Sequence, residues 1–323
     1  MSAVTSLKAS SALLLWWLAG MVAAGEAADG QDPVHWLERM NQAVARLAYH
    51  GHFVYLSGRS LEGMRIRHRI VDGRPVESLL SLNGEPREVI RDARTLTIVV
   101  HQNGKVRRVR QPAGTRFSPM KPLEAASLST SYRLVMGRPA RVADRWGVVV
   151  LFVPRDDLRY GYRLTLDREW ALPLDLMVID AEGEVVSRIM FTDLQVETGD
   201  DPQPQPAAPL TVAEAPAAAP AAEAETNHAG WRFESLPAGF RLLTHRHYAD
   251  GHQDHFIFSD GLATISAYVE PLAEGDRPFN GRARLGSIHA VGRPLAERQL
   301  TVVGEVPYKT LELIAGALKP AGD

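Results

Sequence analysis

Turn dipeptides place the tightest limit on what this chain can fold into. An Asp-Gly or Asn-Gly pair joins neighbouring antiparallel strands, because both of its residues accept the left-handed backbone conformation that a two-residue hairpin turn requires. Such pairs separate short stretches rich in β-branched and aromatic residues at Asp72-Gly73, Asn83-Gly84, Asn103-Gly104, Asp250-Gly251 and Asp260-Gly261. The sequence therefore predicts an α+β protein, mostly antiparallel β, built from hairpins.

Composition divides the 323 residues into four parts. Residues 1–28 carry Lys8, a short apolar run from Ala12 to Ala24 and then small residues, a pattern typical of a cleaved signal peptide. Residues 199–230 are rich in Pro and Ala with few large apolar side chains, which predicts a linker without a core of its own. Residues 29–198 and 231–323 are therefore predicted to be two folded domains. The chain contains no cysteine, so each domain depends on core burial instead of disulfides.

Periodicity predicts the elements of each domain. In the first domain, Asp32 and Pro33 open a helix whose buried stripe includes Trp36, Met40 and Val44, and strand-rich segments then follow as far as Val196. A helical or irregular segment, Pro122 to Met136, is expected to interrupt those strands. A long, curled antiparallel sheet with a helix on one face would close this domain. The second domain is predicted to hold further hairpins and a last helix from Pro307, with a buried stripe of Leu311, Ile314, Ala315 and Leu318.

One strand carries a row of arginines. Alternation in the segment from Met64 to Ile70 places Arg65, Arg67 and Arg69 on one face and the apolar residues on the other. Three guanidinium groups in a row could bind the phosphates of a lipid headgroup. The alternative is that they form only the solvated face of a half-buried strand.

Four histidines gather around one predicted turn: His245, His247, His252 and His255. A hairpin could bring the second pair opposite the first and supply the ligand count of a zinc site. An exposed histidine-rich hairpin tip is the simpler interpretation, because no known zinc-ligand spacing is present. The prediction is that this cluster holds no metal.

Signatures of catalysis and of nucleic-acid binding are missing from the sequence. There is no nucleophile elbow, phosphate-binding loop, metalloprotease motif or dinucleotide fingerprint, and no thiol that could act as a nucleophile. The formal net charge is −2 and no long basic run occurs, which argues against a nucleic-acid partner. We therefore expect a binding protein that is not an enzyme and needs no cofactor.

Several segments, in order along nearly the whole mature chain, resemble the MucB/RseB family of periplasmic sigma-factor regulators. They are Met40 to Val44, Arg67 to Asp92, Gly137 to Val186, Leu236 to Phe240, Phe258 to Glu270 and Val302 to Thr310. The resemblance implies a large N-terminal domain similar to the lipoprotein carriers LolA and LppX, an open half-barrel with helices across its mouth, followed by a smaller α+β domain.

The same resemblance implies a function. Family members bind the periplasmic part of a membrane-spanning anti-sigma factor and protect it from proteolysis during the envelope stress response, until lipid or lipopolysaccharide releases it. In relatives close to MucB this pathway controls alginate production. We expect a periplasmic protein in which Arg65, Arg67 and Arg69 bind the lipid, while Phe256, Phe258 and Tyr268 contact the partner. A periplasmic lipid or lipoprotein carrier is the alternative, and a homo-oligomer is left open.

Overall fold

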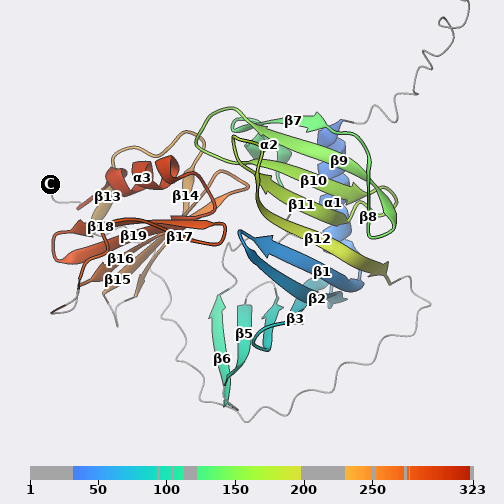
Figure 1. Cartoon of the computed structure of the whole chain (residues 1–323), viewed down its shortest axis with the longest axis horizontal. Coiled ribbons are helices and arrows are strands. Elements are labelled where there is room, and N and C mark those ends of the chain that lie inside the picture. The colour runs from blue at the N-terminus through green and yellow to red at the C-terminus, as the bar shows by residue number, and fades with distance from the viewer. Residues whose placement is uncertain are drawn as a thin grey trace, which may run out of the picture. The chain divides into compact units, whose positions relative to one another are not determined.

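The computed structural model describes residues 32–92, 95–102, 105–112, 122–197, 230–248, 252–272, 275 and 277–320. The predicted signal peptide and nearly all of the predicted linker lie outside these residues. The chain from Pro33 onward forms one compact unit. Three helices and three antiparallel sheets make up the described part of that unit (Figure 1).

The first sheet has twelve strands and is open, because its order runs from β6 through β5, β4, β3, β2, β1, β12, β11, β10 and β9 to β7, with β8 paired on β9. β1 pairs with both β2 and β12, so it joins the two halves of the sheet. The strands are β1 (Tyr49–Ser57), β2 (Ser60–Val71), β3 (Arg74–Ser81), β4 (Arg87–Arg91), β5 (Thr95–Gln102), β6 (Lys105–Pro112), β7 (Tyr132–Met136), β8 (Ala140–Val142), β9 (Arg145–Pro154), β10 (Gly161–Asp167), β11 (Pro173–Ile179) and β12 (Val185–Val196).

Helix α1 (Pro33–Arg46) packs on one face of this sheet, where it contacts β3 and β7 (Figure 1). It begins at Pro33, as predicted, since proline suits the first turn of a helix. Its buried residues, Trp36, Leu37, Met40, Ala43 and Val44, enter a core shared with the strands. We call the side of the sheet that faces α1 the inner face. The predicted fold class, an open and mostly antiparallel sheet with a helix on one face, is confirmed.

The second large sheet has six strands in the order β14-β15-β16-β19-β18-β17, and β13 and β20 form a separate two-stranded sheet. Helix α3 (Tyr308–Ala317) covers one face of it, against β18 and β19. The strands are β13 (Trp231–Phe233), β14 (Arg241–Tyr248), β15 (Gln253–Ser259), β16 (Thr264–Pro271), β17 (Gly281–Leu285), β18 (Ile288–Leu295), β19 (Arg298–Gly304) and β20 (Leu318–Pro320).

Two local predictions are wrong, and some short strands were not predicted. The segment expected to be helical or irregular holds helix α2 for only Ala125–Leu128, and then strand β7, because its residues pair with β9 at the sheet edge. Strands β4 and β17 were not predicted, since both are short and lack a clear apolar alternation. The last helix ends at Ala317, and Leu318 instead begins β20, which pairs with β13.

Candidate functional site

The predicted arginine row lies on the outer face of β2. Burial alternates along the strand as predicted, with Met64, Ile66 and His68 buried while Arg65 and Arg69 are exposed and Arg67 is half-buried.

The row joins a polar network on that outer face. Arg65 Nε lies 3.3 Å from His52 Nε2, and His52 Nδ1 lies 3.3 Å from an Asp193 carboxylate oxygen. The row therefore points away from α1 and from the apolar interior, and its role in lipid binding stays a prediction.

The inner face of β3 to β5 offers a different combination of apolar and basic groups. Leu79, Val89 and Ile98 are half-buried and lie side by side across the three strands, next to the buried Ile66 of β2. On β4, Arg87 and Arg91 stand on either side of Val89 on the same face. This apolar strip with a cation at each end suits a ligand that joins a hydrocarbon chain to an anionic group.

Both of these arginines are already paired with carboxylates. Arg87 donates to Glu62 Oε2 at 2.7 Å, and Arg91 donates to both oxygens of Glu77 at 3.2 and 3.1 Å. Burial raises the pKa of Glu77, and the charge of Arg91 opposes that rise. An anionic ligand at this end of the strip would compete with a carboxylate that is costly to keep ionised.

Beside Glu77, two rings are stacked beneath α1. The Tyr49 and His68 ring centroids lie 4.7 Å apart, and both residues are buried. Burial, reinforced by the charge of Arg91, lowers the pKa of His68 to about 4. This histidine is therefore neutral at ordinary pH, and acidification would place a charge inside the core.

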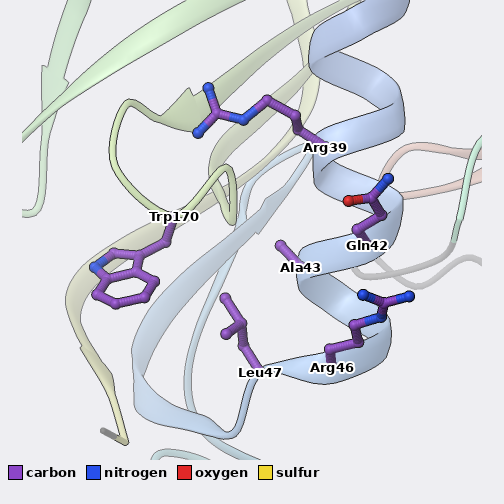
Figure 2. Close-up of a pocket in the computed structure, with 6 residues that line it drawn as sticks. All are labelled: Arg39, Gln42, Ala43, Arg46, Leu47 and Trp170. Atoms are coloured by element: carbon purple, nitrogen blue, oxygen red, sulfur yellow. The ribbon is translucent and has the colours of Figure 1, made fainter.

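A pocket of about 240 Å³ lies between α1 and the β10–β11 turn that carries Trp170 (Figure 2). Ala43, Leu47 and Trp170 provide apolar surface, and Arg39 and Arg46 of the helix belong to the same lining, with Arg39 extending toward the Trp170 turn. The Arg39 guanidinium lies 4.3 Å from the Trp36 ring centroid and donates to Glu169 O at 3.1 Å. The pocket repeats the chemistry of the inner strip, an apolar floor beside cations.

A buried ion pair joins the two large sheets. Arg159 Nη1 donates to Asp260 Oδ2 at 2.7 Å, and both side chains are 0% exposed. Tyr132 Oη donates to the same carboxylate oxygen at 2.9 Å, while Arg159 also bonds to Asp156 and to Ala238 O. Burial disfavours the charge on Arg159, yet the hydrogen bond to Asp156 and the charge of Asp260 outweigh it and raise the pKa of Arg159. We call this set of groups the junction network.

Further contacts support the junction network. Thr310 Oγ1 donates to Leu158 O at 2.5 Å, and the Tyr160 hydroxyl lies 3.4 Å from His289 Nδ1. Leu262, from the β15–β16 turn, is buried within the core of the first sheet. Sequence reasoning identified Asp260 only as a turn residue and did not single out Arg159, because no local pattern reveals a pair that lies 101 positions apart.

The three aromatic residues predicted to contact a partner differ in accessibility. Phe256 and Phe258 are 0% exposed, and both make edge contacts with Phe233 in the core of the second sheet. Tyr268 lies half-buried on the opposite face, where its ring stacks on His255 at 4.2 Å. As partner contacts they stay predictions, and Tyr268 is the one whose ring a partner could reach in the folded chain.

The four histidines do not converge on one point. His245 Nε2 and His247 Nδ1 both bond to Asp254 Oδ1, at 2.9 and 3.0 Å, whereas His255 follows Asp254 and points to the other face of the strand. The arrangement of all four imidazoles around one ion, considered from the hairpin pattern, does not form. In the described part of the chain, no three His, Cys, Asp or Glu side chains are placed to hold a metal ion. Among these same residues, no helix is long and apolar enough to span a membrane.

Comparisons with known proteins agree with one another. The family models of the MucB/RseB N-terminal domain and the MucB/RseB C-terminal domain match residues 32–218 and 225–319. The sigma factor AlgU regulatory protein MucB of Pseudomonas aeruginosa is 33% identical over 324 residues, which cover 97% of this chain and 98% of that protein. The sigma-E factor regulatory protein RseB of Escherichia coli K12 is 25% identical over 296 residues, or 88% of this chain and 89% of RseB.

A solved structure confirms the fold. The crystal structure of MucB in complex with MucA(peri) aligns with a TM-score of 0.66 at 29% identity, covering 90% of this chain and 100% of that one. Both domain models, the curated relatives and this structure describe the same kind of protein over nearly the full length. The chain belongs to the MucB/RseB family of sigma-factor regulatory proteins.

Proposed function

We propose that this chain is a periplasmic regulator that binds the periplasmic region of a membrane anti-sigma factor and protects that region from proteolysis. Lipid or lipopolysaccharide produced during envelope stress would release it. The relative of known structure, MucB, was crystallised with MucA(peri), which supports a partner of this class.

The junction network is the observation that carries the proposal. The Arg159–Asp260 pair is fully buried and holds the two sheets in one arrangement. A partner that touches both domains would bind this arrangement more tightly than any other. A second ligand that favours another arrangement of the two sheets would then lower the affinity for the partner without contacting it.

For the lipid signal, the inner strip of Leu79, Val89 and Ile98 is the better supported site. Its apolar surface would take the acyl chain, and Arg87 or Arg91 would take the phosphate. The outer row of Arg65, Arg67 and Arg69 has cations and solvent access, but its apolar neighbours do not form a continuous strip: Val71 follows Arg69 on β2, and Leu80 and Val76 on β3 are separated by Ser78.

The test is a protection assay with the full chain, the purified periplasmic domain of the cognate anti-sigma factor and the protease that initiates its degradation. The chain is expected to slow cleavage, and lipopolysaccharide is expected to restore it. Arg87→Ala should raise the lipopolysaccharide concentration needed for release, whereas the pair Arg65→Glu and Arg67→Glu should leave it unchanged. The opposite ranking would assign the lipid to the outer row, and a chain that gives no protection would end the proposal.

The inner strip also favours a second candidate function, that of a lipid or lipoprotein carrier. A carrier would be purified from cells with stoichiometric cargo and would not need the second domain to bind an anti-sigma factor. Native mass spectrometry of the purified protein that showed such cargo, together with no binding of the anti-sigma fragment, would favour this alternative.

A further inference from the structure

Two hairpin turns, one from each large sheet, touch at their tips. Ser287 N donates to Ser57 Oγ at 3.0 Å, and the two hydroxyl oxygens lie 2.8 Å apart. A Cβ atom on Gly58 would lie 3.0 Å from Gly286 Cα, and φ is positive at both glycines. The two turns therefore pack backbone against backbone, at a distance that only glycine allows.

A buried carboxyl group reinforces this contact. Glu305 lies beside Ser287 and Ser187, and Ser187 is the residue of β12 that pairs with Ser57. Burial raises the pKa of Glu305. The tip contact is thus separate from the Arg159–Asp260 pair and fixes a second point of the same arrangement.

Large apolar side chains stand exposed around this contact. Leu285 is 84% exposed and faces Ile288, 38% exposed, across the β17–β18 turn. Leu61, 58% exposed, follows Gly58 by three residues, and Leu82 is 47% exposed. The Asn83 side chain holds Leu82 beside Leu61, because its amide donates to Leu61 O at 3.1 Å and its Oδ1 accepts from Gly63 N at 2.6 Å. We call these four residues, Leu61, Leu82, Leu285 and Ile288, the tip patch.

Cations border the tip patch. Arg59 and Arg284 are exposed in or beside the two turns. Exposed apolar groups bordered by polar ones are typical of interaction sites, and the charge indicates an acidic occupant.

We propose that the tip patch is the docking surface for a segment of the anti-sigma partner that carries apolar side chains next to carboxylates. The inference rests on the proposed function and adds a location to it. Because two of the four residues come from each sheet, the patch is complete only while Gly58 and Gly286 touch. A ligand that separates the turns divides the patch and lowers the affinity for the partner without competing for its site.

The first experiment measures binding of the full chain to the periplasmic domain of the cognate anti-sigma factor by isothermal titration calorimetry. Leu61→Asp and Leu285→Asp are each expected to weaken binding at least tenfold. Val71→Asp is the matched control, since Val71 is 44% exposed at the far end of the same strand as Leu61. It should change affinity less than twofold, and all three variants should keep the wild-type unfolding midpoint.

The second experiment locks the tip contact. The chain has no cysteine, so Ser57→Cys with Ser287→Cys introduces a single pair of thiols at a contact close enough for a disulfide. The oxidised protein should bind the partner at least as tightly as wild type and should keep it when lipopolysaccharide is added, while reduction should restore release. Equal release by the oxidised and reduced forms would overturn the inference.

The outcomes separate the two proposals. If wild type binds the fragment and the aspartate variants bind equally well, the tip patch is not the docking surface although the proposed function stands. If wild type does not bind, the proposed function itself fails. Flotation with phosphatidylglycerol vesicles completes the test, because a loss of vesicle binding with unchanged partner binding would show that the patch contacts membrane instead.

Discussion

Removing the Asp260 carboxylate is expected to weaken the attachment of the second sheet to the first. In Asp260→Ala the fully buried Arg159 keeps Asp156 and Ala238 O as partners but loses a bond of 2.7 Å, and the buried Tyr132 hydroxyl loses its acceptor. Breaking one side of a buried ion pair costs about 3–5 kcal/mol. Because Asp156 still pairs with Arg159, we expect a cost at the lower end of this range, about 3 kcal/mol. This cost would lower the ratio of docked to undocked second sheet roughly a hundredfold.

Two measurements test this value. Urea unfolding of wild type, Asp260→Ala, Arg159→Ala and the double variant forms a double-mutant cycle. The coupling free energy between Arg159 and Asp260 should be about 2–3 kcal/mol, because removing the second side chain costs little stability once the first is gone. The rate of disulfide formation in Ser57→Cys, Ser287→Cys should fall when Asp260→Ala is added, because the tips meet less often.

Asp175→Ala is the matched control. Asp175 is equally buried and binds Arg163 and Arg188 within the first sheet, at 3.1 and 2.7 Å. This change should lower stability without slowing the disulfide. The reasoning fails if the coupling between Arg159 and Asp260 is below about 0.5 kcal/mol, the level at which independent sites add, or if Asp175→Ala slows the disulfide as much as Asp260→Ala does.

Three further predictions follow from single side chains. The pKa of His68 is about 4 in the folded chain, below its ordinary value of 6.5, so the unfolded chain binds more protons between these two pH values. The free energy of unfolding should therefore fall by about 3 kcal/mol as the pH drops from 6.5 to 4. Urea titrations of His68→Phe over the same pH range should show a correspondingly smaller loss of stability. Phe256→Ala should lower the free energy of unfolding by about 3–5 kcal/mol, because its side chain is 0% exposed, and a cost below about 1 kcal/mol would contradict its place in the core. Gly58 has a φ of 58° and faces Gly286, so Gly58→Ala should lower the free energy of unfolding by about 1–2 kcal/mol from backbone strain alone. The same change should slow disulfide formation in the Ser57→Cys, Ser287→Cys protein, and an unchanged rate would show that the two turns are not in close contact.

Local chemistry explains which parts of the fold could be predicted. The β2–β3 turn was predictable because Asp72 and Gly73 both adopt positive φ, and α1 because a proline begins an amphipathic stripe. Strand β17 gave no signal, since all five of its residues are exposed and nothing in GRARL alternates. It forms only because β18 is available to pair with it, which is a property of the folded chain.

The candidate sites were less accessible to sequence reasoning for a similar reason. The alternation of Arg65, Arg67 and Arg69 was predictable, but their position on the face away from α1 depends on where the helix packs. The inner strip requires the register of β3, β4 and β5, and the junction network requires two residues distant in sequence to meet. Each of these depends on tertiary pairing, for which a single sequence provides no period or spacing.

The burial of Leu262 inside the first core has a consequence for dissecting this protein by truncation. A fragment that stops before Trp231 would lack one of its own interior side chains, and a fragment that starts there would display that leucine to water. Neither fragment would keep the packing around Leu262 that the intact chain has. Point substitutions that keep both halves together therefore report on recognition more faithfully than deletions do.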